Sequence, residues 1–533
     1  MARVLTNLIR LTSFALIATV IFVDAASGQS KKETNSNTSQ QDNKQLPTKN
    51  RKKEIPLARP VEIQNLITEA HLAPAEFGID ALIRIAESSK VSDRRWKIEI
   101  LEEAFRLTAD VQRPVRRKAV PLPNIPVDTK AGYLSYAYDL KLDVLSLRCR
   151  ILETMLRVDK KRTRELLSEL DPQLHLQPLA CEDSLVYEVS GFYATVAKVV
   201  GATFTEEERK QGDYLRFVLP YVEAISSPAQ VAPVIKLILD LNVNSIELIE
   251  LGRALSLRLK KMPSDDRSFS YTFQRDLTSG VYELFKLYSE RDLPTNELSE
   301  SLRVFLTRNL QSSRCAENKN LNTQFLPQFV KFANSFMFLN SPLSIDDLKP
   351  ERIESAAAVH SYWESPESQR LLSKSKKLRF SATQESSAVT GQEDEEQSGE
   401  SDDVASTESE RKQAGWQQEA AVLLSELEQW HDSQETSEMD HFHQKSVLYQ
   451  GLFEMCPAGS LRERIQRSYV NYLANHNAQK ENRIEWFLHA RYLLNAIRNV
   501  EKEDRVILLD ALANSASPTL RLYADLARLQ PQP

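Results

Sequence analysis

Apolar residues recur along most of this chain at the spacing of an α-helix. The segment 133–158 shows the pattern best, because it carries two apolar stripes and one polar face. The first stripe contains Ala137, Leu140, Val144, Leu147, Ile151, Met155 and Val158, and the second contains Tyr138, Leu142, Leu145, Cys149, Leu152 and Leu156. A helix with two adjacent apolar stripes must contact more than one neighbour. The pattern therefore predicts a helix inside a stacked array.

The helical period continues through two long blocks, residues 61–378 and 413–529. Prolines fall in the short breaks between apolar runs, where they start or end helices without kinking them. Antiparallel helices joined by short loops build bundles and α-solenoids. We therefore predict an all-α fold of antiparallel helical hairpins, stacked as an irregular α-solenoid or multi-helix array. The repeat patterns of tetratricopeptide and ankyrin proteins are absent, so we assign no family.

The glycine content supports this fold class. The chain has 13 glycines in 533 residues, far below the typical share of ~7%. Tight β-turns and phosphate-binding loops depend on glycine, because it adopts positive φ without strain. A chain with so little glycine is expected to be mostly helical.

The first 28 residues have the pattern of a secretory signal peptide. Arg3 and Arg10 give a positive start, residues 11–23 are apolar, and small residues follow Asp24. A membrane-spanning helix needs ~20 apolar residues, so this stretch is too short, and we expect cleavage near Ser27. The sequence therefore predicts export to the periplasm or the medium, with an uncleaved N-terminal tether as the alternative and no stable transmembrane segment after cleavage.

Two polar segments flank the helical blocks, and they carry opposite charge. Residues 29–60 are basic, and residues 379–412 are acidic and rich in serine, with ten acids and no base between residues 384 and 410. Neither has an apolar period, so both are predicted to be disordered linkers. The acidic segment is interpreted as a solvated insertion, with a cation-binding or partner-binding tail as the alternative. The rest of the chain is nearly neutral, so a nucleic-acid partner is not expected.

The cysteines are disulfide candidates in an exported chain. Cys149 lies in an apolar stripe and Cys456 ends an apolar run, so both are expected to be buried thiols. Cys181 and Cys315 lie in polar surroundings, and we predict a bridge between them. The next candidate is a Cys149–Cys181 bridge.

The carboxylates that follow Cys181 are interpreted as part of a helix start. Glu182 and Asp183 fall in the expected first turn of a helix, where acids complement the helix dipole. A nucleophilic Cys181 with His175 as its base is disfavoured, because two adjacent carboxylates raise the pKa of a thiol.

Motifs for chemistry are scarce. The sequence lacks HExxH, CxxC, GxGxxG, GxSxG and the phosphate-loop motif, so no cofactor and no catalytic residue are predicted. The nearest approach to a metal-ligand set is His431, His441 and His443. Residues two apart lie on different sides of a helix, so these three would need an extended or turn segment to share an ion. A polar loop with incidental histidines is the preferred interpretation.

These observations favour an exported, non-enzymatic scaffold. Stacked helices make extended surfaces suited to a protein, a peptide or a component of the cell envelope. The alternative is an exported hydrolase whose active site comes together only in three dimensions. A purely structural role without a ligand site is the third hypothesis.

Overall fold

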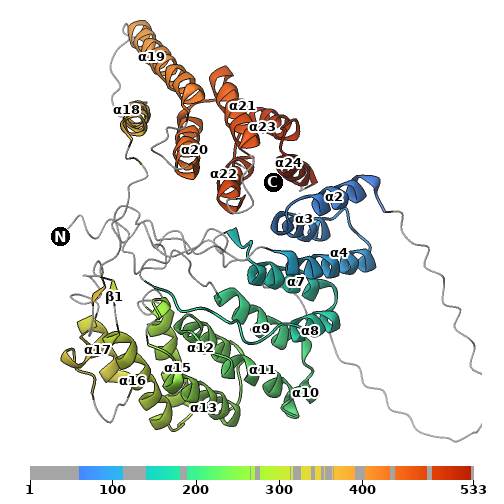
Figure 1. Cartoon of the computed structure of the whole chain (residues 1–533), viewed down its shortest axis with the longest axis vertical. Helices are drawn as coiled ribbons and strands as arrows, with labels where there is room; N and C mark the ends of the chain where they lie inside the picture. The colour runs from blue at the N-terminus through green and yellow to red at the C-terminus, as the bar shows by residue number, and fades with distance from the viewer. Residues whose placement is uncertain are drawn as a thin grey trace, which may run out of the picture. The chain divides into compact units, whose positions relative to one another are not determined.

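The fold is described from a computed structural model of the whole chain (Figure 1). The described residues are 59–111, 140–180, 189–264, 266–269, 276–312, 314–315, 326–337, 342–349, 353–354, 363, 365–389, 402–431, 438–476, 483–497 and 499–529. The predicted signal peptide, most of the basic linker and Cys181, Glu182 and Asp183 therefore lie outside the described part.

The all-α prediction is confirmed. The helices before residue 337 are α2 (Val61–Leu72), α3 (Ala75–Glu87), α4 (Arg94–Leu107), α7 (Val144–Val158), α8 (Lys160–Ser168), α9 (Ser190–Thr203), α10 (Glu206–Lys210), α11 (Asp213–Glu223), α12 (Val231–Asp240), α13 (Ser245–Lys261), α15 (Thr278–Glu290), α16 (Asn296–Gln311) and α17 (Leu326–Phe336). The later helices are α18 (Pro366–Val389), α19 (Asp402–Gln429), α20 (Glu438–Met455), α21 (Ser460–Asn475), α22 (Arg483–Ala496), α23 (Lys502–Ala513) and α24 (Pro518–Leu529). Strands β1 (Arg314–Cys315) and β2 (Ile353–Glu354) form one short parallel pair.

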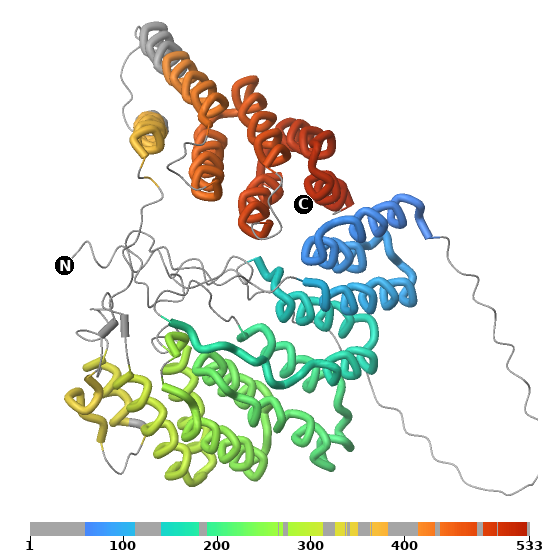
Figure 2. The backbone as a smooth tube through the Cα atoms, in the orientation of Figure 1, coloured from blue at the N-terminus to red at the C-terminus, as the bar shows by residue number. Residues whose placement is uncertain are grey.

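Helices α3 to α17 stack in two rows. In one row α3, α7, α9, α12, α15 and α17 follow one another, and each packs on the next. On the other side α4 and α8 pack against α7, and α11, α13 and α16 form a continuous second row. The tube in Figure 2 shows this succession from blue through green to yellow. The stacking is consistent with the expected α-solenoid.

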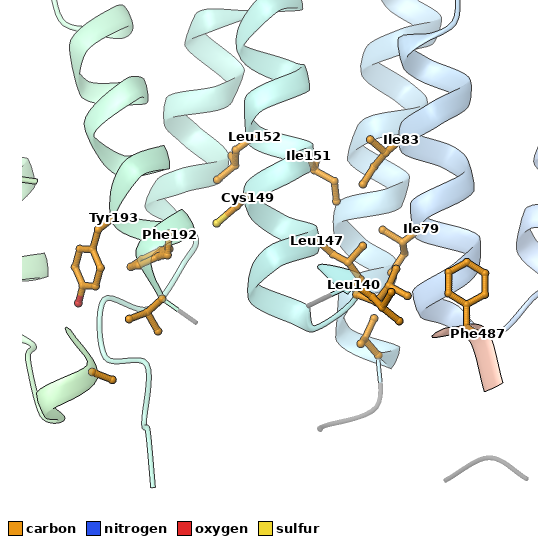
Figure 3. Close-up of a cluster of buried hydrophobic side chains, with 14 of the residues drawn as sticks. Ile79, Ile83, Leu140, Leu147, Cys149, Ile151, Leu152, Phe192, Tyr193 and Phe487 are labelled. Atoms are coloured by element: carbon orange, nitrogen blue, oxygen red, sulfur yellow. The ribbon is translucent and has the colours of Figure 1, made fainter. Parts of the chain in front are cut away.

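Helix α7 uses its two apolar stripes as the sequence predicts. Figure 3 shows Leu147 and Ile151 on the side of α3, near Ile79 and Ile83, whereas Cys149 lies on the side of α9. All five of these side chains are buried. The two stripes therefore hold α7 between its two neighbours in the row.

Within the described residues, the predicted helix over 133–158 is interrupted at Lys141. Lys141 has a positive φ of 56°, and the Asp143 side chain accepts a hydrogen bond from the backbone N–H of Ser146. The turn and the cap start α7 at Val144, because a carboxylate satisfies free N–H groups at a helix start. Residues 131–139 lie outside the described part.

Two helices extend into the predicted linker 379–412. Helix α18 runs to Val389 and α19 begins at Asp402, so both enter that segment. Buried Leu378 in α18 and Trp416 in α19 anchor the two helices, and the Trp416 indole donates to the Leu378 carbonyl at 3.1 Å. An acidic, serine-rich sequence can extend a helix that is already held by packing, because each added residue gains one backbone hydrogen bond as long as no proline interrupts it.

Helix α18 belongs with the second block rather than with the first. It packs on α19 and α20, so the predicted boundary at residue 378 falls inside a helix of the second block. The sequence left open whether this block is separate or packs on the first. The last helix, α24, packs on α2 and α3, so residues from the two ends of the described chain share one core.

A buried carboxylate lies at the centre of that shared core. Asp80 of α3 accepts hydrogen bonds from Arg84 at 2.9 Å, from Arg150 of α7 at 2.5 Å and from the Tyr523 hydroxyl of α24 at 2.6 Å. Burial alone would raise the pKa of Asp80, but the two guanidinium groups and the tyrosine outweigh it and lower the pKa to about 2. The carboxylate is therefore charged and fully satisfied.

Ionic and aromatic contacts surround this carboxylate. Glu76 of α3, itself only 1% exposed, forms an ion pair with Arg483 of α22. The ring of Phe77 lies 4.5 Å from that of Phe487, which in turn lies 4.9 Å from Tyr523. Polar and apolar contacts thus join α3 to α22 and α24 over the same small area.

We expect Asp80→Asn to lower the free energy of unfolding by about 3–5 kcal/mol, because it leaves two partly buried guanidinium groups without their countercharge. Tyr523→Phe removes one hydrogen bond to a charged acceptor and should cost about 1.5–3 kcal/mol. Urea unfolding measures both values. The matched control is Asp525→Asn, which breaks only an exposed pair with Arg528 and should cost under about 1 kcal/mol. Equal losses for Asp80→Asn and Asp525→Asn would contradict the central role of Asp80.

Candidate functional site

An open groove crosses four helices of the first row. It has a volume of about 830 Å3, and its lining comes from α7, α9, α12 and α15, together with Lys141 and Asp276 from the segments before α7 and α15. This volume lies within the range of ~300–1,000 Å3 typical of ligand pockets. The groove forms because helices in one row expose a continuous side to solvent.

The floor of the groove is apolar. Cys149, Phe192 and Leu237 contribute buried surface from three different helices. Figure 3 shows Cys149 and Phe192 facing the space between α7 and α9. Burial raises the pKa of the Cys149 thiol to about 12, so the thiol stays protonated and is not a nucleophile.

Small residues keep the groove open. Gly191, Ala194, Ala232 and Gly280 lie along its lining, and a side chain added at Gly191 would meet open space. Beneath them, Gln230 donates from Nε2 to the Tyr193 hydroxyl at 2.9 Å and so ties α9 to the start of α12. Both side chains are fully buried. The walls are therefore held by buried hydrogen bonding, while the open side is free to receive a ligand.

The rim of the groove is charged. Glu153 accepts from Lys198 at 2.5 Å, and Lys236 pairs with Asp240 at 3.2 Å. Asp276 and Glu283 are exposed at the α15 end. No histidine is among the described residues that line the groove, and its only thiol is protonated. An apolar floor with a charged rim suits the binding of a peptide better than covalent catalysis.

The three histidines proposed as metal ligands have different neighbours. His441 and His443 lie in α20, where His441 packs its ring 4.4 Å from Trp430 and His443 contacts His489 of α22. His431 is exposed after α19. Among the described residues, no group of three or more His, Cys, Asp or Glu side chains is placed to hold a metal ion. This part of the structure thus gives no support to the metal candidate.

His443 and His489 instead form a buried chain of hydrogen bonds. The Gln450 amide donates to Nδ1 of His489 at 3.1 Å, so Nε2–H of His489 donates to Nδ1 of His443 at 2.9 Å. Burial and the neighbouring His443 lower the pKa of His489 to about 3. Burial and Lys445 lower the pKa of His441 to about 4. Burial opposes the charged form, so the imidazoles of His441 and His489 are neutral at pH 7.

The cysteine predictions are tested only in part. Cys181 lies outside the described residues, and nothing is described of the Cys315 side chain, so the Cys181–Cys315 bridge stays a prediction. Cys149 and Cys456 are buried free thiols, as predicted. The alternative Cys149–Cys181 bridge also stays a prediction, because Cys181 lies outside the described residues.

Sequence reasoning did not find the groove. Its lining is spread from Lys141 to Glu283, and the positions share no local motif. The only signal was the set of small residues on helix surfaces, which is too common to select these positions without the fold.

Comparison with protein families, with curated proteins and with solved structures finds no match to this chain. The class of protein is therefore defined by its fold and groove alone, as an all-α protein with an open groove across stacked helices. In the described part, no helix combines the length and apolar character needed to span a membrane.

We predict that the second block loses stability in mild acid. The pKa values of His441 and His489 in the fold lie below the unfolded value of 6.5, so unfolding takes up protons and stability falls as pH drops below 6.5. Each histidine should contribute about 1 kcal/mol between pH 7.5 and 5.5. Urea unfolding at the two pH values measures the loss.

The variant His489→Gln keeps a hydrogen-bonding side chain that does not titrate, so its loss on acidification should be smaller by about 1 kcal/mol. His175→Asn is the control, because His175 is exposed and its positive φ of 48° is tolerated by asparagine. An unchanged acid dependence in His489→Gln would show that the His443–His489 chain does not control it.

Proposed function

We propose that this chain is an exported helical scaffold that binds a peptide segment of a partner protein or of a cell-envelope component in the groove of α7, α9, α12 and α15. The observation that carries the proposal is the groove itself, with its buried apolar floor and charged rim. Helical arrays bind extended segments because successive helices repeat similar surface along one direction.

The nature of the lining favours a peptide over a reactive substrate. Apolar floor positions such as Phe192 and Leu237 suit side chains, and rim charges such as Lys236 and Glu283 suit the polar groups of a peptide. The hydrolase alternative needs facing carboxylates or converging histidines. No observation in the described residues favours it, since His431, His441 and His443 have separate neighbours.

The export part of the proposal rests on the sequence of residues 1–28. Its positive start, short apolar stretch and small residues are those of a secretory signal peptide. Export places the groove where it meets proteins of the periplasm, the medium or the cell envelope.

Filling the groove tests the binding function. Gly191 of α9 lines the groove and has free space around it, so Gly191→Trp should place an indole in the groove without disturbing the helix. Peptides selected from a phage-displayed random library on the full chain should bind Gly191→Trp at least about tenfold more weakly, measured by fluorescence anisotropy.

The same helix offers a matched control. Gly201 also has free space around it and does not line the groove, so Gly201→Trp should leave peptide affinity unchanged. Thermal unfolding of both variants confirms that they fold. A selection that enriches no peptide, or peptides that bind the two variants equally well, would overturn the proposal.

Export is tested with a reporter that is active only outside the cytoplasm. Residues 1–60 fused to alkaline phosphatase should give activity in a bacterial host, and N-terminal sequencing of the secreted fusion should find a cut near Ser27. Leu16→Arg puts a charge into the apolar stretch and should abolish the activity. The control is Lys44→Glu, which changes a charge beyond the predicted cleavage site. An active Leu16→Arg fusion would argue against a signal peptide.

A further inference from the structure

The charges of the groove are unevenly distributed, and their partners show where the imbalance lies. At the α7 end, Arg150 is neutralised by Asp80 at 2.5 Å and Glu153 by Lys198 at 2.5 Å. Lys141 is exposed there and has no ion-pair partner among the described residues. This end therefore keeps one uncompensated positive charge.

The α15 end has the opposite sign. Lys236 and Asp240 of α12 pair with each other at 3.2 Å. Asp276 and Glu283 are exposed and have no ion-pair partner in the part of the chain that the structure describes. The lining from α12 and the α15 end thus carries three carboxylates and one ammonium group. A ligand that enters the groove meets net negative charge here and net positive charge near α7.

An exposed aromatic pair lies outside the lining of the groove, one residue along α15 from Glu283. Tyr282 precedes Glu283 on α15, and its ring lies 5.6 Å from that of Phe332 on α17. The two residues are 40% and 36% exposed, unlike most large aromatic side chains of the fold. Aromatic faces attract ammonium and guanidinium groups, and arginine also stacks on them. The aromatic pair therefore favours the same class of side chain as the neighbouring carboxylates.

We infer that the partner segment is a basic one, with lysine or arginine side chains bound at the α15 end between Asp276 and Glu283, and its apolar side chains on the floor of the groove. This inference rests on the proposed peptide-binding function and deepens it by naming the class of ligand. The uncompensated Lys141 at the other end repels lysine and arginine side chains. The segment therefore lies with its basic residues toward α15 and away from α7.

The test is a comparison of peptide selections. A random phage-displayed library is selected on the wild-type chain and on the double variant Asp276→Lys/Glu283→Lys. Wild type should enrich peptides rich in lysine and arginine, and the double variant should enrich acidic peptides instead.

An affinity measurement tests the same charges with a milder change. A basic peptide from the first selection should bind the Asp276→Asn/Glu283→Gln variant about three- to tenfold more weakly than it binds wild type. Its affinity for wild type should fall as salt rises.

The control is Glu290→Lys, which reverses an exposed acid on the same helix that does not line the groove. It should keep the preference of the wild type.

The outcomes separate the two proposals. If Gly191→Trp blocks peptide binding but the selected peptides show no preference for basic residues, the present inference is wrong and the proposed function stands. If the double variant keeps the preference, the acidic end does not select the ligand. If no peptide is enriched at all, both fall.

Discussion

The Asp80 carboxylate is the contact on which the arrangement of this fold depends. It is buried in α3, and it satisfies groups from α7 and α24 that are otherwise far apart in the sequence. A charge in such a place is stable only when its partners are in position, because an unpaired buried carboxylate costs several kcal/mol. Asp80 therefore ties α3 both to α7, its neighbour in the row, and to α24, the last helix of the chain.

The groove follows from this constraint and from the stacking of the row. Arg150 is held by Asp80 and lines the α7 end of the groove, so the core contact and the candidate site share a side chain. The floor is closed by buried side chains and by the Gln230–Tyr193 hydrogen bond, whereas both ends of the rim keep charges that have no ion-pair partner among the described residues. A rigid floor with an uncompensated rim is what selective binding of a flexible segment requires, since the protein has little conformational entropy to lose.

The second block differs in its chemistry. Its core contains imidazoles, the Lys445 ammonium and phenol hydroxyls, held by hydrogen bonds such as the one from Lys445 to the Trp430 carbonyl at 2.7 Å. Burial lowers the pKa of Lys445 to about 8. We expect this polar core to make the block sensitive to acid, whereas no histidine is among the described residues that line the groove.

The sequence by itself determined the helical class, the two stripes of α7, the burial of Cys149 and Cys456, and the charge difference between the two polar segments. These depend on local period and composition, which a single chain displays directly. Tertiary structure alone decided the break at Lys141, the contact of Asp80 with Tyr523, and the meeting of Lys141, Gly191 and Glu283 at one groove. Asp80 and Tyr523 are 443 residues apart, and no period links such positions; only the packing of complete helices brings them together.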